Sequence, residues 1–578
     1  MLKSKIENYL KKAIHKMLTN VDLTRTNADW KVFIPEQEQF GHYSTNVALK
    51  LAKILKRNPI QIAEEIKSHL EKQPNIFGLI KEARVAPPGF INFWLSKKTL
   101  VNELKQVIKK DKNYGRSNIG KNKTIVIDYS APNIAKPMNV GHLRSTIIGQ
   151  TLVNLFRFQN YRVIGDNHLG DWGTQFGALL LAYKKWGNKK QFEKNPIDYL
   201  VKLYVRFHKA SDKNHNLLAA AREETKKLQL GDKENLKLWR LFTKESLKDF
   251  NKIYKRLGIK FDYALGESFY QPMLKAVVQE ALKKGIAKID DGAVKIFFNE
   301  LLKLPARGDS RASASLPPLV IQKSDGSYLY STTDLATIKY RLKKWRPEKI
   351  LYVVANEQTL YFEQVFNAAL LLNYGSKNLL EHIKFGMILG ETGKKMSTRR
   401  GQFIKLEALL DKAVSEAAKI NKKVAESVGI GAVKYRILSQ ERLNDIVFDW
   451  KQMLNLKGNS SPYLQYTYAR LKSVLNKART LPKKIDFSLL EKDSEKSIMR
   501  QIIYFPDIIS RAVALRETNI LTDYLFKLAN LLNNFYESEP ILKAPKSLAE
   551  NRLNLIKAGT IILKNGLNLL GIEVLEKM

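Results

Sequence analysis

His142 and Gly141 stand where an expected strand, a tight turn and a helix meet, which suits them to binding a phosphate. Residues 124–130 form a short β-branched run typical of a buried strand, and Pro132 and Pro137 break up the chain after it. The following helical pattern repeats an apolar face at Ile148, Leu152 and Leu155. A helix N-terminus attracts anions, glycine permits close approach, and histidine can donate a hydrogen bond. Val-Gly-His alone would also fit a histidine that only caps a helix.

Three further motifs follow this segment in a fixed order. They are Gly170–Gly177, the stretch from Gln322 to Ala336 that includes Tyr330 and Asp334, and Gly393–Gly401. Together with residues 128–149, they resemble the signature regions of class I aminoacyl-tRNA synthetases. The run Ser130–Pro137 is similar to arginyl-tRNA synthetases in particular. The resemblance extends from about Phe40 to Met578, which is nearly the whole chain.

The resemblance implies a definite reaction. Such an enzyme uses ATP to activate L-arginine as arginyl-adenylate and then transfers arginine to the 3′-terminal adenosine of tRNA(Arg), releasing AMP and pyrophosphate. The class implies that attachment begins at the 2′-hydroxyl. ATP enters with Mg²⁺ as a substrate complex, and no tightly bound metal is expected. The expected partners are therefore tRNA(Arg), L-arginine and ATP.

Activation needs positioning and charge stabilisation more than covalent chemistry from the protein. The resemblance implies catalytic roles for Asn139, His142, Lys136, Lys395 and Ser397, and ATP contacts from Asn139, Gly141, His142, Lys395, Met396 and Ser397. Asn139 replaces the family's usual histidine, and Thr398-Arg399 replace Lys-Ser in the second signature. Lys136 is the candidate for the missing cation, although it could also be one more solvated lysine.

Arginine recognition requires planar acceptors for a guanidinium with five donors. Asp334 can supply such an acceptor, and Tyr330 would share its face if the segment is helical. Gln358 and Asn133 suit the ammonium and carboxylate groups of the substrate. By resemblance, the arginine-binding set is Ala131, Pro132, Asn133, His142, Tyr330, Asp334 and Gln358, with Asp128 adding negative charge. Without the resemblance, Asp334 would be read as a helix cap.

Composition limits the class of protein. The 578 residues include 98 Lys and Arg against 56 Asp and Glu, a formal charge of +42, which favours polyanionic partners. A general lysine bias explains part of that excess. Cysteine is absent, and the eight histidines show no metal-ligand spacing. No apolar run reaches the ~20 residues that span a bilayer, and the start lacks the apolar core of a signal peptide. We expect a cytoplasmic monomer without membrane contact.

The expected fold class is α/β, divided into three parts, and the resemblance implies the tRNA contacts of the first and the third. Residues 1–110 form an N-terminal α/β module that binds the tRNA elbow, although it could also be a packing domain without a role in RNA binding. Residues 111–405 form a Rossmann-like parallel-sheet catalytic domain, with an insertion at about 187–305 that includes a hairpin at 287–298. Residues 406–578 form an all-α bundle that binds the anticodon. In that bundle the expected tRNA contacts are Tyr463, Gln465, Tyr466 and Arg470.

The sequence also contains one misleading motif, and two other classes of protein are alternatives to this assignment. Gly115–Asn122 nearly matches a Walker A loop, but Asn122 replaces the Ser or Thr that binds magnesium, and the loop precedes a strand instead of following one. A cysteinyl-type class I synthetase is disfavoured because zinc ligands are lacking. A non-catalytic RNA-binding relative is disfavoured by both signature regions, although Asn139 keeps that alternative open.

Overall fold

A parallel sheet forms the centre of the computed structural model, which describes all residues except 19–29, 299–315, 391–392, 394–403, 479–481 and 483. Its spatial order is β11-β10-β5-β6, and all pairs are parallel. The strands are β5 (Thr124–Asp128), β6 (Arg162–Asp166), β10 (Lys349–Tyr352) and β11 (Leu380–His382). Helix α6 (Val140–Phe158) links β5 to β6. The predicted α/β class with a parallel sheet is confirmed.

The insertion between β6 and β10 contains a helical group and a small antiparallel sheet. The helices are α7 (Thr174–Trp186), α8 (Lys189–Lys194), α9 (Pro196–Ser211), α10 (Asn216–Gln229), α11 (Lys233–Arg256) and α12 (Glu267–Lys283). The sheet consists of β7 (Ala287–Asp290), β8 (Ala293–Ile296) and β9 (Leu319–Gln322), so the predicted hairpin is confirmed. Helices α13 (Tyr330–Trp345) and α14 (Thr359–Leu371) then flank β10, with the 3-10 turn η3 (Asn356–Gln358) before α14.

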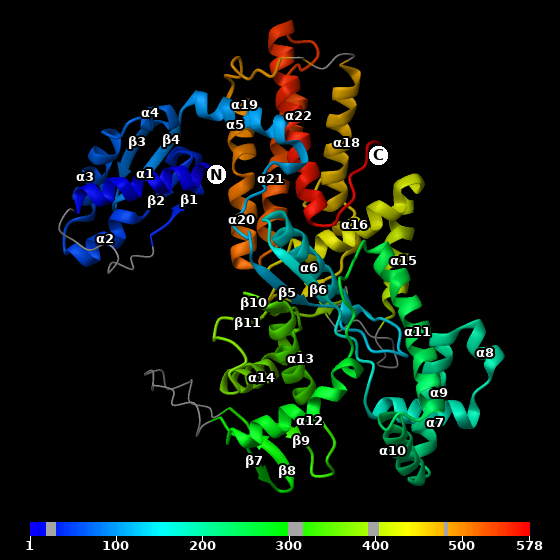
Figure 1. Ribbon diagram of the computed structural model, residues 1–578. Coiled ribbons are helices and arrows are strands. Elements are labelled where there is room, and N and C mark those ends of the chain that lie inside the picture. The colour runs from blue at the N-terminus through cyan, green and yellow to red at the C-terminus, as the bar shows by residue number, and fades with distance from the viewer. Residues whose placement is uncertain (19–29, 299–315, 391–392, 394–403, 479–481, 483) are drawn as a thin grey trace.

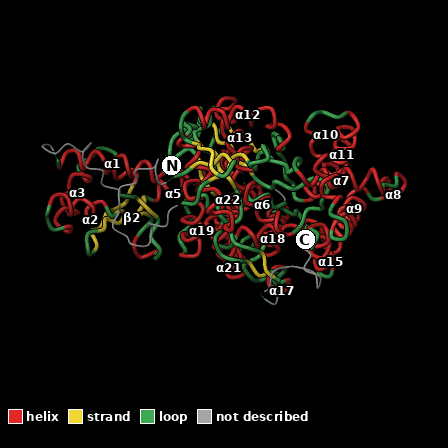
Figure 2. Tube along the Cα trace, turned by 90° about the horizontal axis from the view of Figure 1, so that it is seen from below, coloured by secondary structure: helices red, strands yellow, loops and turns green. Residues whose placement is uncertain are grey.

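The N-terminal lobe is built on an antiparallel sheet of order β1-β2-β4-β3. Its elements are α1 (Leu2–Met17), β1 (Val32–Phe33), η1 (Glu38–Phe40), β2 (Tyr43–Thr45), α2 (Val47–Leu55), α3 (Pro59–Glu71), α4 (Ile76–Leu79), β3 (Ile80–Ala86) and β4 (Phe90–Leu95), followed by α5 (Lys97–Lys110) and η2 (Asp111–Asn113). This lobe and the α7–α11 group lie at opposite ends of the molecule (Figures 1 and 2). Gly115–Asn122 precedes β5, as expected for a loop that is no P-loop.

Helices dominate the last part of the chain. They are α15 (Leu406–Ala418), η4 (Lys422–Val424), α16 (Ala425–Leu438), α17 (Trp450–Met453), α18 (Ser461–Lys477), α19 (Asp493–Ile503), α20 (Phe505–Leu515), α21 (Asn519–Ser538) and α22 (Lys546–Leu569). The short strands β12 (Ile388–Leu389) and β13 (Ile446–Val447) pair in parallel. The predicted apolar stripe of α21 is fully buried at Leu521, Leu525, Leu528, Leu532 and Phe535. That stripe is therefore bundle core, as predicted.

Buried contacts fix the N-terminal lobe to the helical bundle. The Tyr43 hydroxyl donates to Asp507 Oδ2 at 2.7 Å, and the Tyr504 hydroxyl donates to the His42 carbonyl at 2.8 Å. Both contacts lie in the interior, where an unmade hydrogen bond costs the most. The lobe is thus attached through specific polar pairs on α20 and the residue preceding it.

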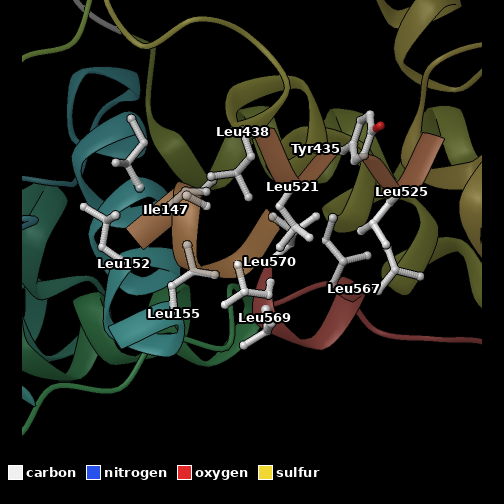
Figure 3. Packing of buried hydrophobic residues seen from close by; sticks show 14 of the residues in the cluster. Ile147, Leu152, Leu155, Tyr435, Leu438, Leu521, Leu525, Leu567, Leu569 and Leu570 are labelled. Atoms are coloured by element: carbon white, nitrogen blue, oxygen red, sulfur yellow. The ribbon is translucent and has the colours of Figure 1, made fainter. Parts of the chain in front are cut away.

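The signature helix α6 shares its core with the helices of the C-terminal bundle. Figure 3 shows Ile147, Leu152 and Leu155 of α6 facing side chains of α16, α21 and α22, including Leu438 and Leu569. These residues belong to one continuous buried cluster that extends from the N-terminal lobe to the end of the chain. The helical bundle therefore supports the helix whose N-terminus carries the signature histidine.

Candidate active site

The signature turn places His142 at the third position of α6, directly above its N-cap residue Asn139. The Asn139 amide N–H donates to His142 Nδ1 at 3.1 Å, and Asn139 Oδ1 accepts from the Gly141 amide at 2.9 Å. An accepting Nδ1 carries no proton, so the neutral ring holds its proton on Nε2. Burial lowers the pKa of His142, which favours that neutral form. The capping alternative and the phosphate-donor role are therefore compatible, because they use different ring nitrogens.

The local structure also explains why glycine stands at position 141 and asparagine at position 139. A Cβ atom on Gly141 would lie 2.9 Å from Asn139 Oδ1, so glycine gives the capping oxygen its space. Because Oδ1 accepts from the helix, the Nδ2 amide group of Asn139 is left to donate elsewhere. Asparagine in place of the usual histidine thus provides a strong helix cap and a neutral donor.

The loop between β5 and α6 has an unusual backbone. Ser130, Ala131 and Ala135 have φ values of 78°, 48° and 63°, in the left-handed region that side chains other than glycine rarely adopt. Side chains hold this shape: the Ala131 amide donates to Asn167 Oδ1 at 3.1 Å, and the Ala135 amide donates to Ser246 Oγ at 2.9 Å. Strained backbone that is held in place by several surrounding contacts is common at functional sites.

The second motif lies against this loop. Asn133 forms a β-bridge with Gly170, and the Ile134 amide donates to the Gly170 carbonyl at 3.0 Å. A Cβ at Gly170 would come within 2.1 Å of Asn133 Oδ1, so only glycine fits beneath that side chain. Asn133 is exposed, whereas its neighbour Pro132 is buried. The structure thus brings the first two motifs together.

Three carboxylates converge next to the loop. Asp334 lies on α13, Glu267 is the first residue of α12, and Asp171 follows Gly170. Burial, and then the charges of Asp171 and Asp334, raise the pKa of Glu267 to about 8. Burial likewise raises the pKa of Asp334, although the charge of His168 opposes that shift. A carboxylate whose pKa is raised by burial and by two neighbouring carboxylates marks a site that favours a cation.

The helix assumed for Tyr330 and Asp334 is present, and the two residues lie one turn apart on α13. Tyr330 is exposed by 64%, whereas the Asp334 carboxylate accepts a hydrogen bond from the Tyr361 hydroxyl on α14. Asp171 is tied down as well: Ser268 donates to it through its amide at 2.8 Å and through its hydroxyl at 2.6 Å. Asp334 and Glu267 are the carboxylates best placed to meet a ligand.

Asp128 has a buried partner of its own. Arg341 Nη2 donates to Asp128 at 2.6 Å and to Asp166 at 2.8 Å, and the arginine side chain is fully buried. Two carboxylates against one guanidinium leave one net negative charge in the trio. Arg341, which lies two turns beyond Asp334 on α13, therefore offsets much of the negative charge that Asp128 adds to the pocket.

Other expected site residues occupy the rim or lie outside the described residues. Gln358 is exposed at the end of η3, beyond the carboxyl end of β10. Lys136 is exposed too, and its ammonium lies 5.1 Å from the centre of the Tyr204 ring. The predicted residues Lys395, Met396 and Ser397 lie in the stretch that the structure does not describe.

The four expected tRNA contacts share α18 but differ in exposure. Gln465 is fully buried, and its amide donates to the Glu573 carbonyl at 2.8 Å. Tyr463 is half-buried and donates to Asn530 at 2.7 Å. The Arg470 guanidinium lies between two partly exposed rings, 4.8 Å from Tyr466 and 5.0 Å from Tyr536. Tyr466 and Arg470 therefore form a half-buried stack in which Arg470 also pairs with Glu537 at 3.1 Å, whereas Gln465 is packed inside the bundle.

Sequence reasoning missed Glu267, Tyr361 and Arg341. Glu267 follows a glycine at a helix start and looks like an ordinary first-turn acid. Its partner Asp334 is distant in sequence, so only folding reveals the charge cluster. For Arg341, the one available signal was its position among apolar neighbours in an expected helix, which could have indicated a buried arginine.

The described part of the chain contains neither a membrane-spanning helix nor a metal-binding group. No described helix combines the length and the apolar character needed to cross a membrane. Among the described residues, no group of three His, Asp or Glu side chains could hold a metal ion.

A parallel sheet followed by a histidine-bearing turn at the start of α6 is the arrangement expected of a class I aminoacyl-tRNA synthetase. Comparisons with known families agree. Residues 103–450 match the family described as tRNA synthetases class I (R), catalytic domain. Residues 4–95 match the arginyl tRNA synthetase N terminal domain, and residues 464–578 match the DALR anticodon binding domain.

Whole-chain relatives support the same assignment. The chain is 41% identical to an arginine–tRNA ligase of Fusobacterium nucleatum, with 95% of each chain covered. It is 38% identical to one of Clostridium botulinum, covering 99% of this chain and all of the relative. Among solved structures, arginyl-tRNA synthetase of Plasmodium falciparum superposes with a TM-score of 0.81 at 28% identity, covering 100% and 99% of the two chains. That of Thermus thermophilus reaches 0.83 at 22% identity over both full chains, which supports the fold.

The chain belongs to the arginyl-tRNA synthetase family. It is an enzyme, an arginine–tRNA ligase, which uses ATP to attach arginine to tRNA. The function expected from the sequence motifs is thereby confirmed.

Proposed function

We propose that the three-carboxylate pocket beside the signature turn selects L-arginine and presents its carboxylate to the α-phosphate of ATP. The observation that carries this proposal is the convergence of Asp334, Glu267 and Asp171: burial, and then the charges of the other two carboxylates, raise the pKa of Glu267 to about 8. Like charges held together without a cation are costly, and a guanidinium with five donors relieves that cost. The proposed arginine site also includes Tyr330, one turn before Asp334 on α13, Asn133, Ala131 and Pro132 on the loop after β5, and Gln358 beyond the carboxyl end of β10.

The signature turn then acts on ATP, which enters as its magnesium complex. His142 Nε2 and Asn139 Nδ2 are neutral donors at a helix N-terminus, where the negative charge of phosphates is favoured. Lys136 supplies a positive charge at the same turn. As the arginine carboxylate attacks the α-phosphate and pyrophosphate leaves, these donors stabilise the growing negative charge. Gly141, Lys395, Met396 and Ser397 complete the proposed ATP contacts.

We further propose a division of labour along the chain. Residues 1–110 bind the tRNA elbow, residues 111–405 carry out catalysis with the insertion at about 187–305, and residues 406–578 bind the anticodon of tRNA(Arg). In the last part, the stack of Tyr466 and Arg470 offers aromatic and cationic faces to unpaired bases. Tyr463 and Gln465 of the same helix complete the proposed tRNA-binding set. The enzyme works as a cytoplasmic monomer.

The amino-acid specificity is tested by charging total tRNA with each of the twenty amino acids in separate reactions. Only arginine should give acid-precipitable aminoacyl-tRNA, and only with ATP and Mg²⁺ present. Equal charging with lysine would contradict a pocket built for a planar guanidinium, because an ammonium cannot bond two carboxylates in the same fork.

Arginine binding should release a proton near neutral pH. The pKa of Glu267 lies at about 8 in the free protein, so below that pH the carboxyl is largely protonated. A bound guanidinium lowers that pKa, and the proton must leave. Arginine affinity should therefore rise with pH up to about 8, by at most about tenfold per pH unit, and then level off. Calorimetry in buffers of different ionisation enthalpy measures the released proton directly.

The matched control for that measurement is Glu267→Gln, which keeps the shape of the side chain but cannot ionise. It should bind arginine more weakly, and its proton release should drop. Proton release that persists unchanged in this variant would assign the titration to another group, with Asp334 the first to examine.

Lys136→Ala should slow arginine-dependent pyrophosphate exchange by roughly tenfold or more, since a charge-assisted hydrogen bond contributes about 1.5–3 kcal/mol. Affinity for tRNA should change only a few-fold, because many phosphate contacts share that binding. Lys136→Arg keeps the charge and should recover most of the exchange rate. A larger loss in tRNA affinity than in exchange would move Lys136 from the phosphate site to the RNA surface.

A further inference from the structure

A buried guanidinium lies at the carboxyl edge of the central sheet. It belongs to Arg341 of α13, whose side chain is fully buried. Its Nη2 atom donates to Asp128 at 2.6 Å and to Asp166 at 2.8 Å. Asp128 is the last residue of β5 and Asp166 the last of β6, and the two residues face each other in the parallel register. One nitrogen of Arg341 therefore joins the ends of two neighbouring strands.

The same side chain meets a third strand. Tyr352 is the last residue of β10 and pairs with Asp128 in the parallel register. The Arg341 guanidinium lies 5.4 Å from the centre of the tyrosine ring. In sheets of this kind, ligands bind beyond the carboxyl ends of the strands. Arg341 thus contacts three strand ends at the edge where the proposed arginine site lies, and it does so from the helix that also carries Asp334.

The strand ends lead directly into the loop with the left-handed backbone. Tyr129 follows Asp128, and its amide donates to the Asp166 carbonyl at 3.3 Å. Ser130, with a φ of 78°, comes next. A shift of Asp128 relative to Asp166 would therefore move the start of the loop that carries Asn133 of the proposed arginine site.

Arg341 also decides how many carboxylates are left for a ligand. Without it, Asp128 and Asp166 would add two uncompensated charges near Asp334 and Glu267, and a bound guanidinium could settle on either pair. Because Arg341 is itself a guanidinium, it already occupies one pair. Burial is the main cause of the raised pKa of Asp334, and the charges of Asp128 and Arg341 act on that carboxyl in opposite directions. The two sets of carboxylates are thus close enough to influence each other.

We propose that Arg341 is a positioning residue that determines specificity for arginine through Asp128. By holding Asp128 against Asp166 as an internal guanidinium, it keeps the loop in place and leaves Asp334 and Glu267 to receive the guanidinium of the substrate. Arg341 acts from behind Asp128 and does not itself bind the substrate, because its side chain is fully buried. The inference rests on the proposed arginine site. A buried ion pair that only supports the fold is the competing interpretation.

The first test is a double-variant cycle of Arg341→Lys and Asp128→Asn, with the KM for arginine measured by pyrophosphate exchange at saturating tRNA(Arg). Lysine keeps the charge but ends one bond before the position of Nη2, so it cannot hold both carboxylates in the same way. Arg341→Lys alone should raise the KM for arginine by roughly tenfold or more, as for a lost charge-assisted hydrogen bond, with the KM for ATP within about twofold. In the Asp128→Asn background the same change should add less than about twofold, because the carboxylate through which it acts is gone. Equal effects in the two backgrounds would overturn the proposal.

The second test asks whether free guanidinium can replace the side chain. Arg341→Ala leaves a space next to Asp128 and Asp166 that suits the shape and charge of a guanidinium. At a fixed, subsaturating arginine concentration, millimolar guanidinium chloride should slow exchange by the unsubstituted chain, because it competes for the arginine site, but should speed exchange by Arg341→Ala. Urea, which is planar but uncharged, should speed neither. Slowing of both chains by guanidinium would contradict the proposal. If the alanine chain does not fold, the cycle with lysine decides the question alone.

Arg552→Lys is the matched control. Arg552 is also buried and also binds two carboxylates, with Nε 2.8 Å from Glu495 and Nη2 3.0 Å from Glu539, but it lies in the helical bundle on α22. Its replacement should lower thermal stability and leave the KM for arginine within about twofold. An equal rise in that KM in Arg552→Lys and Arg341→Lys would mean that general loosening of the fold explains both, which rejects the proposal. An unchanged KM in Asp334→Asn rejects the proposed arginine site first, whereas a rise there without one in Arg341→Lys rejects this inference alone.

Discussion

Replacing His142 with alanine is expected to lower the rate of arginyl-adenylate formation by about 100- to 1000-fold, as for the loss of other preorganised donors that meet a developing charge. The expectation follows from the ring orientation. Nδ1 accepts from the Asn139 amide, so the proton is on Nε2 and points the donor away from the helix. Alanine removes that donor at the position where phosphate charge grows.

Alanine also removes the capping acceptor, so a second variant separates the two effects. In His142→Asn the side-chain oxygen can take the place of Nδ1 and accept from Asn139, whereas the Nδ2 donor of this shorter side chain stops short of the position of Nε2. Pyrophosphate exchange should therefore be as slow in His142→Asn as in His142→Ala, whereas thermal stability should fall only in the alanine variant. Near-normal exchange in both variants would remove residues 139–142 from the signature role.

The pH profile gives an independent check on His142. Burial lowers the pKa of this group, so the ring is already neutral at the pH where an ordinary histidine titrates. The donor is present as pH rises through that range, and activity should not fall there. A loss of exchange on raising the pH through 6 to 7, abolished by His142→Asn, would mean that the charged ring is the active form.

Local sequence patterns predicted the elements around the site well. The β-branched run before Pro132 is β5, the apolar repeat after His142 is α6, and the spacing of Tyr330 and Asp334 is that of one helix turn on α13. These features depend on neighbours in the chain, and periodicity reports such neighbours directly.

Contacts between distant segments could not be predicted in the same way. Glu267 comes near Asp334 only because α12 and α13 pack together, and its pKa of about 8 arises first from burial in that packing and then from the charges of Asp171 and Asp334. Gln465 looks exposed within a motif rich in aromatic and basic residues, yet its amide holds the Glu573 carbonyl inside the bundle. Asp128 follows a strand in the expected way, but its buried partner Arg341 comes from a helix far along the chain. Burial and charge pairing are tertiary properties, so residue type alone leaves them open.

Asp334→Asn should raise the KM for arginine well over tenfold and leave the KM for ATP nearly unchanged. The substitution keeps the shape of the side chain and an oxygen that can still accept from Tyr361. It removes the negative charge that faces the guanidinium, and a charge-assisted hydrogen bond contributes roughly 1.5–3 kcal/mol, or about 10- to 150-fold. Tyr361→Phe is the matched control: it removes the hydroxyl but keeps the charge, and should have a smaller effect.

Glu267 should partly compensate for that loss, which makes the pair testable as a unit. The charge of Asp334 helps to raise the pKa of Glu267, so in Asp334→Asn that pKa falls and a larger fraction of Glu267 is ionised at neutral pH. The double variant Asp334→Asn with Glu267→Gln has no such reserve, and its KM for arginine should exceed the product of the two single effects. Strictly multiplicative effects would mean that the two carboxylates act independently, and an unchanged KM in Asp334→Asn would place Asp334 outside the arginine pocket.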